Sequence, residues 1–347
     1  MSSTSSTPFL TVPNANETET RQLRRTFWVR LNRYARNEDI LALASTNRAH
    51  AEALRPHCFK KVCVSTATHS AQDTYRTLVN HRASIERLRL VLESRGVQDV
   101  LFGGTAGINM IQRIVLGGGV DCDGINWATF LHVFPELQSL TFQDMVIHNP
   151  FGLLRTICRG GLRKVVMKGV FAYHSVVSAA SSHTGFSYLN TEMPSLLTSL
   201  IFNEVGLGGG LLKSIVDLLG LSLRKLQLIN CICDEKEIQY ALGRCPRLTH
   251  FDLCHRDEVF TRALFPSEFA SQNLLFMRLA INFVAFAWFQ SALCKLHRLR
   301  QLSIYKRLRP QLPGIRRALP RLVIHYITTE EFNNLVNREY VERVADG

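Results

Sequence analysis

The sequence predicts an α/β solenoid, a stack of repeated strand–helix units, and three observations lead to that prediction. The first is a six-residue pattern with apolar residues at places one, four and six, as in LRKLQL at residues 223–228. The second is its regular return, because eight of the ten intervals between successive matches are 25 or 26 residues. The third is the helical spacing of apolar residues between most matches. A fixed period of this size is the signature of a repeat architecture.

Each match predicts a short strand, because places four to six alternate between apolar and other residues. The spacing is that of leucine-rich repeats, a horseshoe with parallel strands on the concave face and helices outside. One interval is 35 residues long, and the extra residues near 181–190 predict a surface loop or a loop that contacts a partner. The matches begin at Phe59, Ile85, Ile111, Leu137, Leu162, Leu197, Leu223, Leu248, Leu274, Leu299 and Leu319.

The elements follow one another in a simple order. Residues 1–20 are polar and rich in Ser and Thr, so we expect a disordered tail. Residues 21–58 have apolar residues at helical spacing and predict a module of three short helices that ends near Pro56. The repeats occupy residues 59–327 in about eleven units. Their outer helices are expected at residues 74–81, 127–134, 151–158, 211–219, 235–242 and 283–293.

Residues 328–347 predict a C-terminal helix that closes the last repeat. Thr328 and Glu331 have the spacing of a capping box, in which each side chain bonds the other residue's backbone N–H. The apolar side of this helix is expected to comprise Phe332, Leu335, Val336, Tyr340 and Val344.

The N-terminal module carries a family resemblance. The run NEDILALASTNRAHAEALRPHCFKKV at residues 37–62 resembles the second half of an F-box as fungal F-box/leucine-rich-repeat proteins carry it. The Leu-Pro pair that opens a typical F-box is absent, and RRTFW at residues 24–28 stands near that place. The resemblance implies that the module docks a Skp-type adaptor through Leu31, Ile40, Leu41, Leu43 and Leu54. The alternative is that these helices only cap the first repeat.

Composition limits the kinds of partner and compartment. Lys and Arg number 41 against 28 Asp and Glu, a formal net charge of +13, which favours anionic partners. Nine cysteines without a secretory signal predict reduced thiols in the cytoplasm and/or nucleus. The apolar stretch at residues 279–294 is shorter than the roughly 20 residues of a membrane span, so we expect a buried repeat helix and no membrane partner.

The candidate binding site is the concave face, where the third and fifth places and the residue after the sixth should point outward. Among these places Asp252 is the one carboxylate, whereas cations are frequent. A row of cations on a concave surface would attract acidic or phosphorylated ligands. The predicted target-binding residues are Lys61, Arg87, Arg89, Arg113, Lys164, Lys168, Lys225 and Arg278, and the same rule adds Arg321.

Neither a catalytic nor a metal site is predicted. The glycine runs at residues 103–104, 117–119 and 208–210 lack the Lys-Ser/Thr of a phosphate loop. The spacing of Cys231 and Cys233 is not that of a zinc site, and Cys231 occupies the place where leucine-rich repeats bury an Asn or Cys. We therefore expect a protein without cofactors and without enzymatic activity.

Together these observations and the family resemblance predict a non-catalytic adaptor, the substrate receptor of a Skp–cullin–F-box type ubiquitin ligase. It would select an acidic or phosphorylated protein on its basic concave face. The alternative is a leucine-rich-repeat binding module unrelated to ubiquitin ligation, with an anionic ligand such as nucleic acid.

Overall fold

The chain divides into two units, Met1–Lys60 and Lys61–Gly347, and the residues described by this computed structural model belong to the second. They are residues 61–65, 85, 87–91, 112–117, 125–148, 150–158, 161–172, 195–260, 264–266, 268–270, 272–283, 287–305 and 313–336. The predicted tail, F-box-like module, first outer helix and insertion loop lie outside them. The side chains of Lys61, Phe332, Leu335 and Val336, and all of Tyr340 and Val344, lie outside them too.

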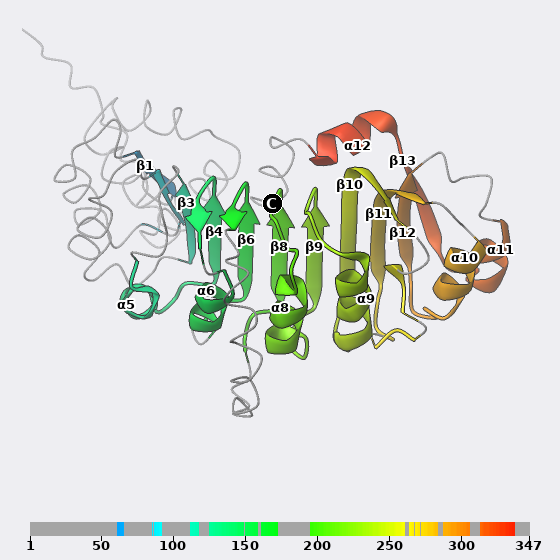
Figure 1. Cartoon of the computed structure of the whole chain (residues 1–347), viewed down its shortest axis with the longest axis horizontal. Coiled ribbons are helices and arrows are strands. Elements are labelled where there is room, and N and C mark those ends of the chain that lie inside the picture. The colour runs from blue at the N-terminus through cyan, green and yellow to red at the C-terminus, as the bar shows by residue number, and fades with distance from the viewer. Residues whose placement is uncertain are drawn as a thin grey trace, which may run out of the picture. The chain divides into compact units, whose positions relative to one another are not determined.

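Within the described residues, eleven parallel strands form one sheet, and their order in the sheet follows their order in the chain (Figure 1). A separate two-stranded sheet pairs β5 (Val146–Ile147) with β7 (Phe171–Ala172). The strands of the main sheet are β1 (Lys61–Ser65), β2 (Arg87–Val91), β3 (Arg113–Gly117), β4 (Ser139–Gln143), β6 (Lys164–Lys168), β8 (Ser199–Asn203), β9 (Lys225–Ile229), β10 (His250–Phe260), β11 (Phe276–Phe283), β12 (Gln301–Tyr305) and β13 (Val323–Ile327).

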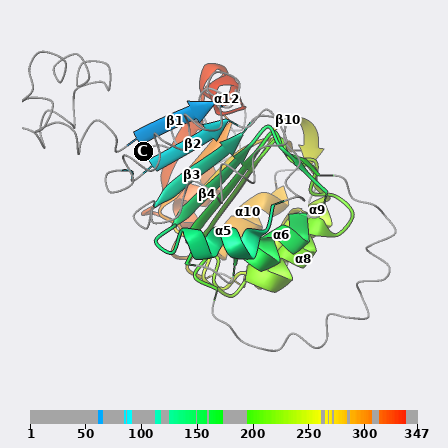
Figure 2. The ribbon, with the colours of Figure 1, turned by 90° about the vertical axis from the view of Figure 1, so that its left-hand side faces the viewer.

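The repeat helices lie along one side of this sheet (Figure 2). The helix with the predicted bounds is α8, and α10 begins four residues later than predicted because β11 continues to Phe283. No helix in the described part of the chain is long and apolar enough to cross a membrane. The helices on this side are α5 (Trp127–Val133), α6 (Pro150–Ile157), α8 (Leu211–Leu219), α9 (Glu235–Arg244), α10 (Ala287–Cys294) and α11 (Pro313–Ala318).

The core lies between the sheet and these helices. The fourth and sixth places of the repeats supply it from the strands, as Leu140 and Phe142 do from β4 with no exposed surface. The helices supply residues such as Phe130 and Ile215, which are also buried. Each such side chain stabilises the fold by roughly 1.5–3 kcal/mol when it is fully buried. The assignment of apolar places to the core is therefore confirmed.

The strand register confirms the predicted template in ten repeats and corrects it in the last. From β1 to β12 every third place pairs with the third place of the next strand, for example Lys61 with Arg87 and Lys225 with His250. In the last repeat Val323 pairs with Gln301, so the strand starts two residues later than predicted. The predicted start of this strand was wrong because two of the leucines that matched the pattern, Leu319 and Leu322, belong to the buried turn before it. In that turn the Leu322 amide donates to the Leu319 carbonyl at 3.0 Å.

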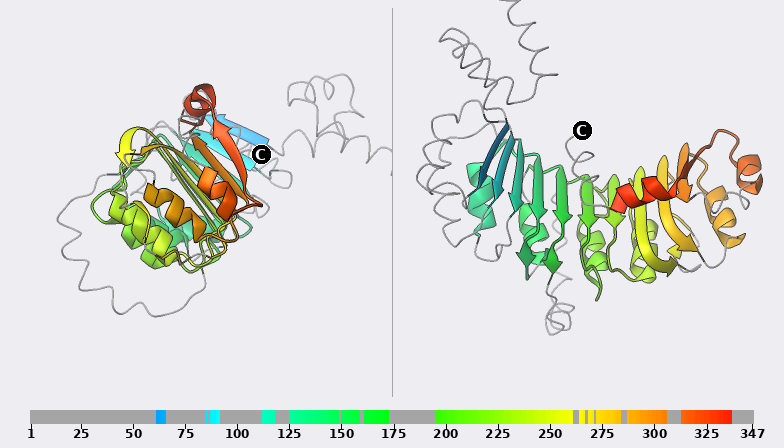
Figure 3. Two further views of the ribbon diagram at one scale, coloured as in Figure 1. Left: turned by 90° about the vertical axis from the view of Figure 1, so that its right-hand side faces the viewer. Right: turned by 90° about the horizontal axis from the view of Figure 1, so that it is seen from above.

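The C-terminal helix α12 (Thr329–Val336) begins with the predicted capping box. The Thr328 amide donates to Oε2 of Glu331 at 2.8 Å, and the Glu331 amide donates to Oγ1 of Thr328 at 3.1 Å. The closing of the last repeat by this helix stays a prediction, because the apolar side chains expected to pack there lie outside the described residues. The helix runs back across neighbouring strands and packs against β10 (Figure 3).

A second, smaller apolar cluster explains this path. The residue after the sixth place is apolar in the C-terminal repeats, and Ile229, Cys254, Ala280 and Ile327 gather with Tyr305 on the side of the sheet away from the core. A helix that lies over them removes them from water. On β4, β6 and β8 the same place holds the polar residues Gln143, Lys168 and Asn203, which do not favour an apolar cover.

Candidate ligand-binding face

The candidate site is the sheet surface opposite the repeat helices, which we call the open face. It consists of three rows of side chains that run across the strands: the third places, the fifth places and the residues after the sixth, called seventh places here. Third places lie near the amino ends of the strands and seventh places near the carboxyl ends. Because the strands are in register, equivalent side chains on neighbouring strands are about 4.8 Å apart.

The third-place row carries most of the predicted cations. Arg87, Arg113, Lys164 and Lys225 are half-buried on β2, β3, β6 and β9, and the backbone of Lys61 is in register with Arg87. From β1 to β9 none of the three rows contains an Asp or Glu. The strand register therefore brings residues 87 and 113 side by side, and their like charges create a positive field over this half of the face.

Arg89 lies in the fifth-place row and is exposed. Its Nη2 donates to Oε1 of Gln143 at 3.3 Å, although β3 lies between their two strands. The intervening seventh place is Gly117, which has no side chain to obstruct the contact. A Cβ on Gly117 would meet the Gln143 carbonyl oxygen at 3.3 Å, closer than a comfortable contact. Gln143 therefore occupies the space beside Gly117, and the guanidinium of Arg89 reaches across β3 to its side chain.

Lys168 is less accessible than the sequence prediction requires, because only 8% of it is exposed. It occupies a seventh place, where the neighbouring Asn203 is also buried. The half-buried carboxylate-bearing residues Asp144 and Glu204 follow the seventh places of β4 and β8. Lys168 therefore has little surface for direct contact with a ligand.

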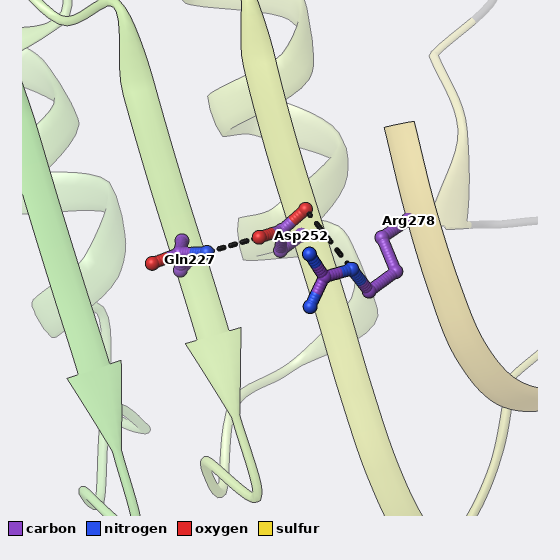
Figure 4. A network of polar contacts seen from close by, with 3 residues as sticks. All are labelled: Gln227, Asp252 and Arg278. Carbon is purple, nitrogen blue, oxygen red and sulfur yellow. Dashed lines mark hydrogen bonds and ion pairs between the residues drawn. The ribbon is translucent and has the colours of Figure 1, made fainter. Parts of the chain in front are cut away.

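Asp252 and Arg278 form a polar network with Gln227 across β9, β10 and β11 (Figure 4). Nε2 of Gln227 donates to Oδ2 of Asp252, and Nε of Arg278 lies 3.8 Å from Oδ1 of the same carboxylate. The side chain of Arg278 is 31% exposed, whereas that of Asp252 is 11% exposed. The one carboxylate in the predicted site is thus paired internally, and it also offsets much of the charge of Arg278.

His250 and Phe276 stack on each other in the third-place row, with ring centroids 4.4 Å apart and planes at 16°. Partial burial lowers the pKa of His250, and the positive charge of Lys225 lowers it further, against the opposing effect of Asp252. The ring is therefore uncharged at neutral pH. The predicted register already made residues 250 and 276 neighbours on this face, but it did not predict that their rings stack.

Arg321 does not belong to the open face. It lies in the turn before β13, and the corrected register puts Val323 and His325 at the third and fifth places instead. Val323 is 64% exposed, which makes this end of the third-place row apolar.

The cysteines of the central repeats belong to the fold. Cys231 is buried as predicted, and its Sγ donates to the Ile229 carbonyl at 3.3 Å. Burial raises the pKa of the Cys231 thiol to about 12. Among the described residues no three His, Cys, Asp or Glu side chains gather in a way that could hold a metal ion.

The comparisons with known proteins identify no family. No family model matches the chain, and no curated protein matches it. Among solved structures, the TLR13–ssRNA13 complex is similar with 11% identity and a TM-score of 0.41, over 77% of this chain and 35% of that one. The Drosophila Toll–Spatzle complex has 11% identity and a TM-score of 0.25, over 73% and 45%. The chain thus spans less than half the length of these two proteins, and its description as an α/β solenoid with leucine-rich-repeat spacing follows from its own strand register and helix placement.

Proposed function

We propose that this protein is a non-catalytic adaptor whose open face binds an acidic or phosphorylated segment of another protein. The observation that carries the proposal is the charge of the open face from β1 to β9. Lysines and arginines occupy five of its seven third places, and no carboxylate occupies any of its three rows. Arginine binds carboxylate and phosphate groups through paired N–H donors, so Arg87, Arg89 and Arg113 suit such a ligand.

The test is charge reversal on the open face. We expect Arg87→Glu with Arg89→Glu to weaken the binding of a fluorescent peptide of Glu and phosphoserine by tenfold or more, measured by anisotropy at physiological ionic strength. The matched control is Arg316→Glu with Arg317→Glu, which changes the charge equally at exposed residues of α11. Equal losses in both variants would show a general effect of net charge and contradict a specific site.

We further propose that the N-terminal module docks a Skp-type adaptor of a cullin ubiquitin ligase, with Leu31, Ile40, Leu41, Leu43 and Leu54 contributing to docking. The support is the resemblance of residues 37–62 to an F-box, followed by repeats with leucine-rich spacing. The full chain should elute with a co-expressed Skp-type adaptor at equal stoichiometry. The Arg87/Arg89 variant should elute with it too, because the open face is not part of that contact. Separate elution of the full chain and the adaptor would leave the module as a cap of the first repeat.

Nucleic acid is the second candidate ligand, favoured by the same basic row. It predicts that the logarithm of affinity falls linearly and steeply with the logarithm of salt concentration. An oligothymidylate titrated at several salt concentrations separates the two candidates, because a peptide held by a few arginines has a shallower slope.

A further inference from the structure

The two halves of the open face differ in chemistry. From β1 to β9 the third places are mainly cationic, whereas from β10 to β13 they are His250, Phe276, Gln301 and Val323. Net charge is therefore concentrated in the first half. Rings and an aliphatic side chain dominate the second half, where Asp252 and Arg278 already pair with each other.

The third-place row is also accessible in the second half. Helix α12 packs against β10, and the seventh places there are buried in their own apolar cluster. In contrast His250 and Phe276 are half-buried, Gln301 is exposed and Val323 is 64% exposed. A ligand that lies on the cationic third places can therefore continue along the same row onto this apolar part.

We propose that the open face binds a two-part segment of a partner protein, with an acidic cluster on β2–β6 and an aromatic or large aliphatic side chain against Phe276 and Val323. This inference rests on the proposed function and adds to it the second feature of the target. The continuity of the two parts along one row, and the charge complementarity of the first part, identify the occupant as one chain with both features.

The spacing of the two features follows from the sheet. From Arg113 on β3 to Phe276 on β11 there are six strand-to-strand steps. At about 4.8 Å a step this is roughly 29 Å, which an extended chain covers in about nine residues. A partner segment should therefore carry its apolar side chain about nine residues from its acidic cluster.

The ring pair favours a protein side chain over a nucleobase. His250 and Phe276 already stack on each other, so each has one face covered by the other ring. The pair therefore offers ring edges and outer faces, a surface on which apolar side chains pack. Single-stranded nucleic acid is more often bound by separate aromatic residues on which successive bases stack.

The experiment uses the full chain and labelled peptides with four glutamates, a nine-residue Gly/Ser spacer and one phenylalanine, made in both orders along the chain. The comparison peptides replace the phenylalanine by serine or shorten the spacer to three residues. Removing a phenylalanine ring from water favours a complex by about tenfold in Kd, so we expect the two-part peptide in its better order to bind about tenfold more tightly than either comparison peptide.

The protein variants locate the contact. Val323→Asp and Phe276→Thr should each reduce this tenfold advantage while leaving the affinity of the serine peptide unchanged. Val323 is so exposed that its substitution leaves the core intact, and it serves as the test if the Phe276 variant does not fold. The matched control is Leu221→Asp, which alters a 77% exposed leucine in the turn between α8 and β9 and should retain the full advantage.

The outcomes separate this inference from the proposed function. If the two-part and serine peptides bind equally, the inference is wrong and acidic-segment binding stands. If no peptide binds, both are wrong. Tighter binding of a twelve-residue oligothymidylate than of the two-part peptide would also overturn the inference, in favour of nucleic acid.

Discussion

The hydroxyl groups of Tyr305 and Thr329 lie 3.1 Å apart, which joins the end of β12 to the first turn of α12. This hydrogen bond holds the start of the helix at the point where the chain reverses direction after β13. Because α12 then packs against β10, its position depends on how firmly its first turn is held. The capping box forms in the same turn, so the box and the Tyr305–Thr329 hydrogen bond both hold the start of α12.

Thr328→Ala should destabilise the protein by about 1 kcal/mol, because the Glu331 amide loses its hydroxyl partner. Urea unfolding checks the magnitude, and hydrogen exchange should show faster exchange in α12 with little change in α8. The Thr328 amide lowers the pKa of Glu331, so the contribution of this carboxylate is present above its unfolded pKa and is lost as the pH falls through the folded pKa. A variant as stable as the parent at neutral pH would contradict the role of the cap.

Asp252→Ala should cost about 1–3 kcal/mol of unfolding free energy, because Gln227 and Arg278 both lose the carboxylate that they contact. The double variant with Arg278→Ala should be less destabilised than the sum of the single changes, since it removes the unpaired charge as well. Urea unfolding of all four proteins gives the coupling. Additive losses would show that the ion pair contributes nothing of its own.

His250 should make stability depend on pH below neutrality. Its pKa is lowered in the folded protein, so the unfolded chain takes up a proton at higher pH than the folded one. The contribution of the neutral ring is therefore present above the unfolded pKa of about 6.5 and is lost as the pH falls through that value towards the folded pKa. His250→Phe keeps a stacked ring without the titration. Its urea midpoint should fall less than that of the parent between pH 7.5 and pH 5, and parallel falls would count against this role.

The buried cysteines should react slowly with alkylating agents. Burial raises the thiol pKa values of Cys158, Cys231, Cys245 and Cys254 to about 12, and the thiolate is the reactive form. Brief treatment of the folded protein with iodoacetamide at pH 8, followed by peptide mapping, should therefore label Cys294 before these four. Cys294 serves as the internal control because it is partly exposed. Rapid labelling of Cys231 in the native protein would contradict its burial.

Much of the fold follows from local sequence, and each exception has its own physical cause. The run at residues 223–228 predicted both strand β9 and the pairing of Lys225 with His250, because apolar places must face one core and the period keeps the strands in register. The path of α12 back to β10 depends on packing between segments far apart in the chain. The predicted start of the last strand was wrong by two residues, because the buried turn before it has the same leucine spacing as a strand.

In the candidate site too, the template predicts where side chains lie but not how accessible they are or what they contact. The positions of Arg87, Arg113, Lys164 and Lys225 in one row follow from the template alone. The burial of Lys168 and the pairing of Asp252 with Arg278 do not, because accessibility depends on the neighbours of each side chain. The template also places residues 250 and 276 side by side, but only the side-chain geometry shows that their rings stack.

The strands of the main sheet follow one another in the order of the chain, and this has a mechanical consequence. Each strand of the main sheet bonds only the strands before and after it in the order of the chain. A force applied to both ends of the repeat array would therefore detach terminal repeats one at a time, since no strand in the described part of the chain pairs with them from a distant part of the sequence. In an optical trap the array should extend in a series of small steps, each releasing roughly one repeat length of chain, instead of rupturing in a single event.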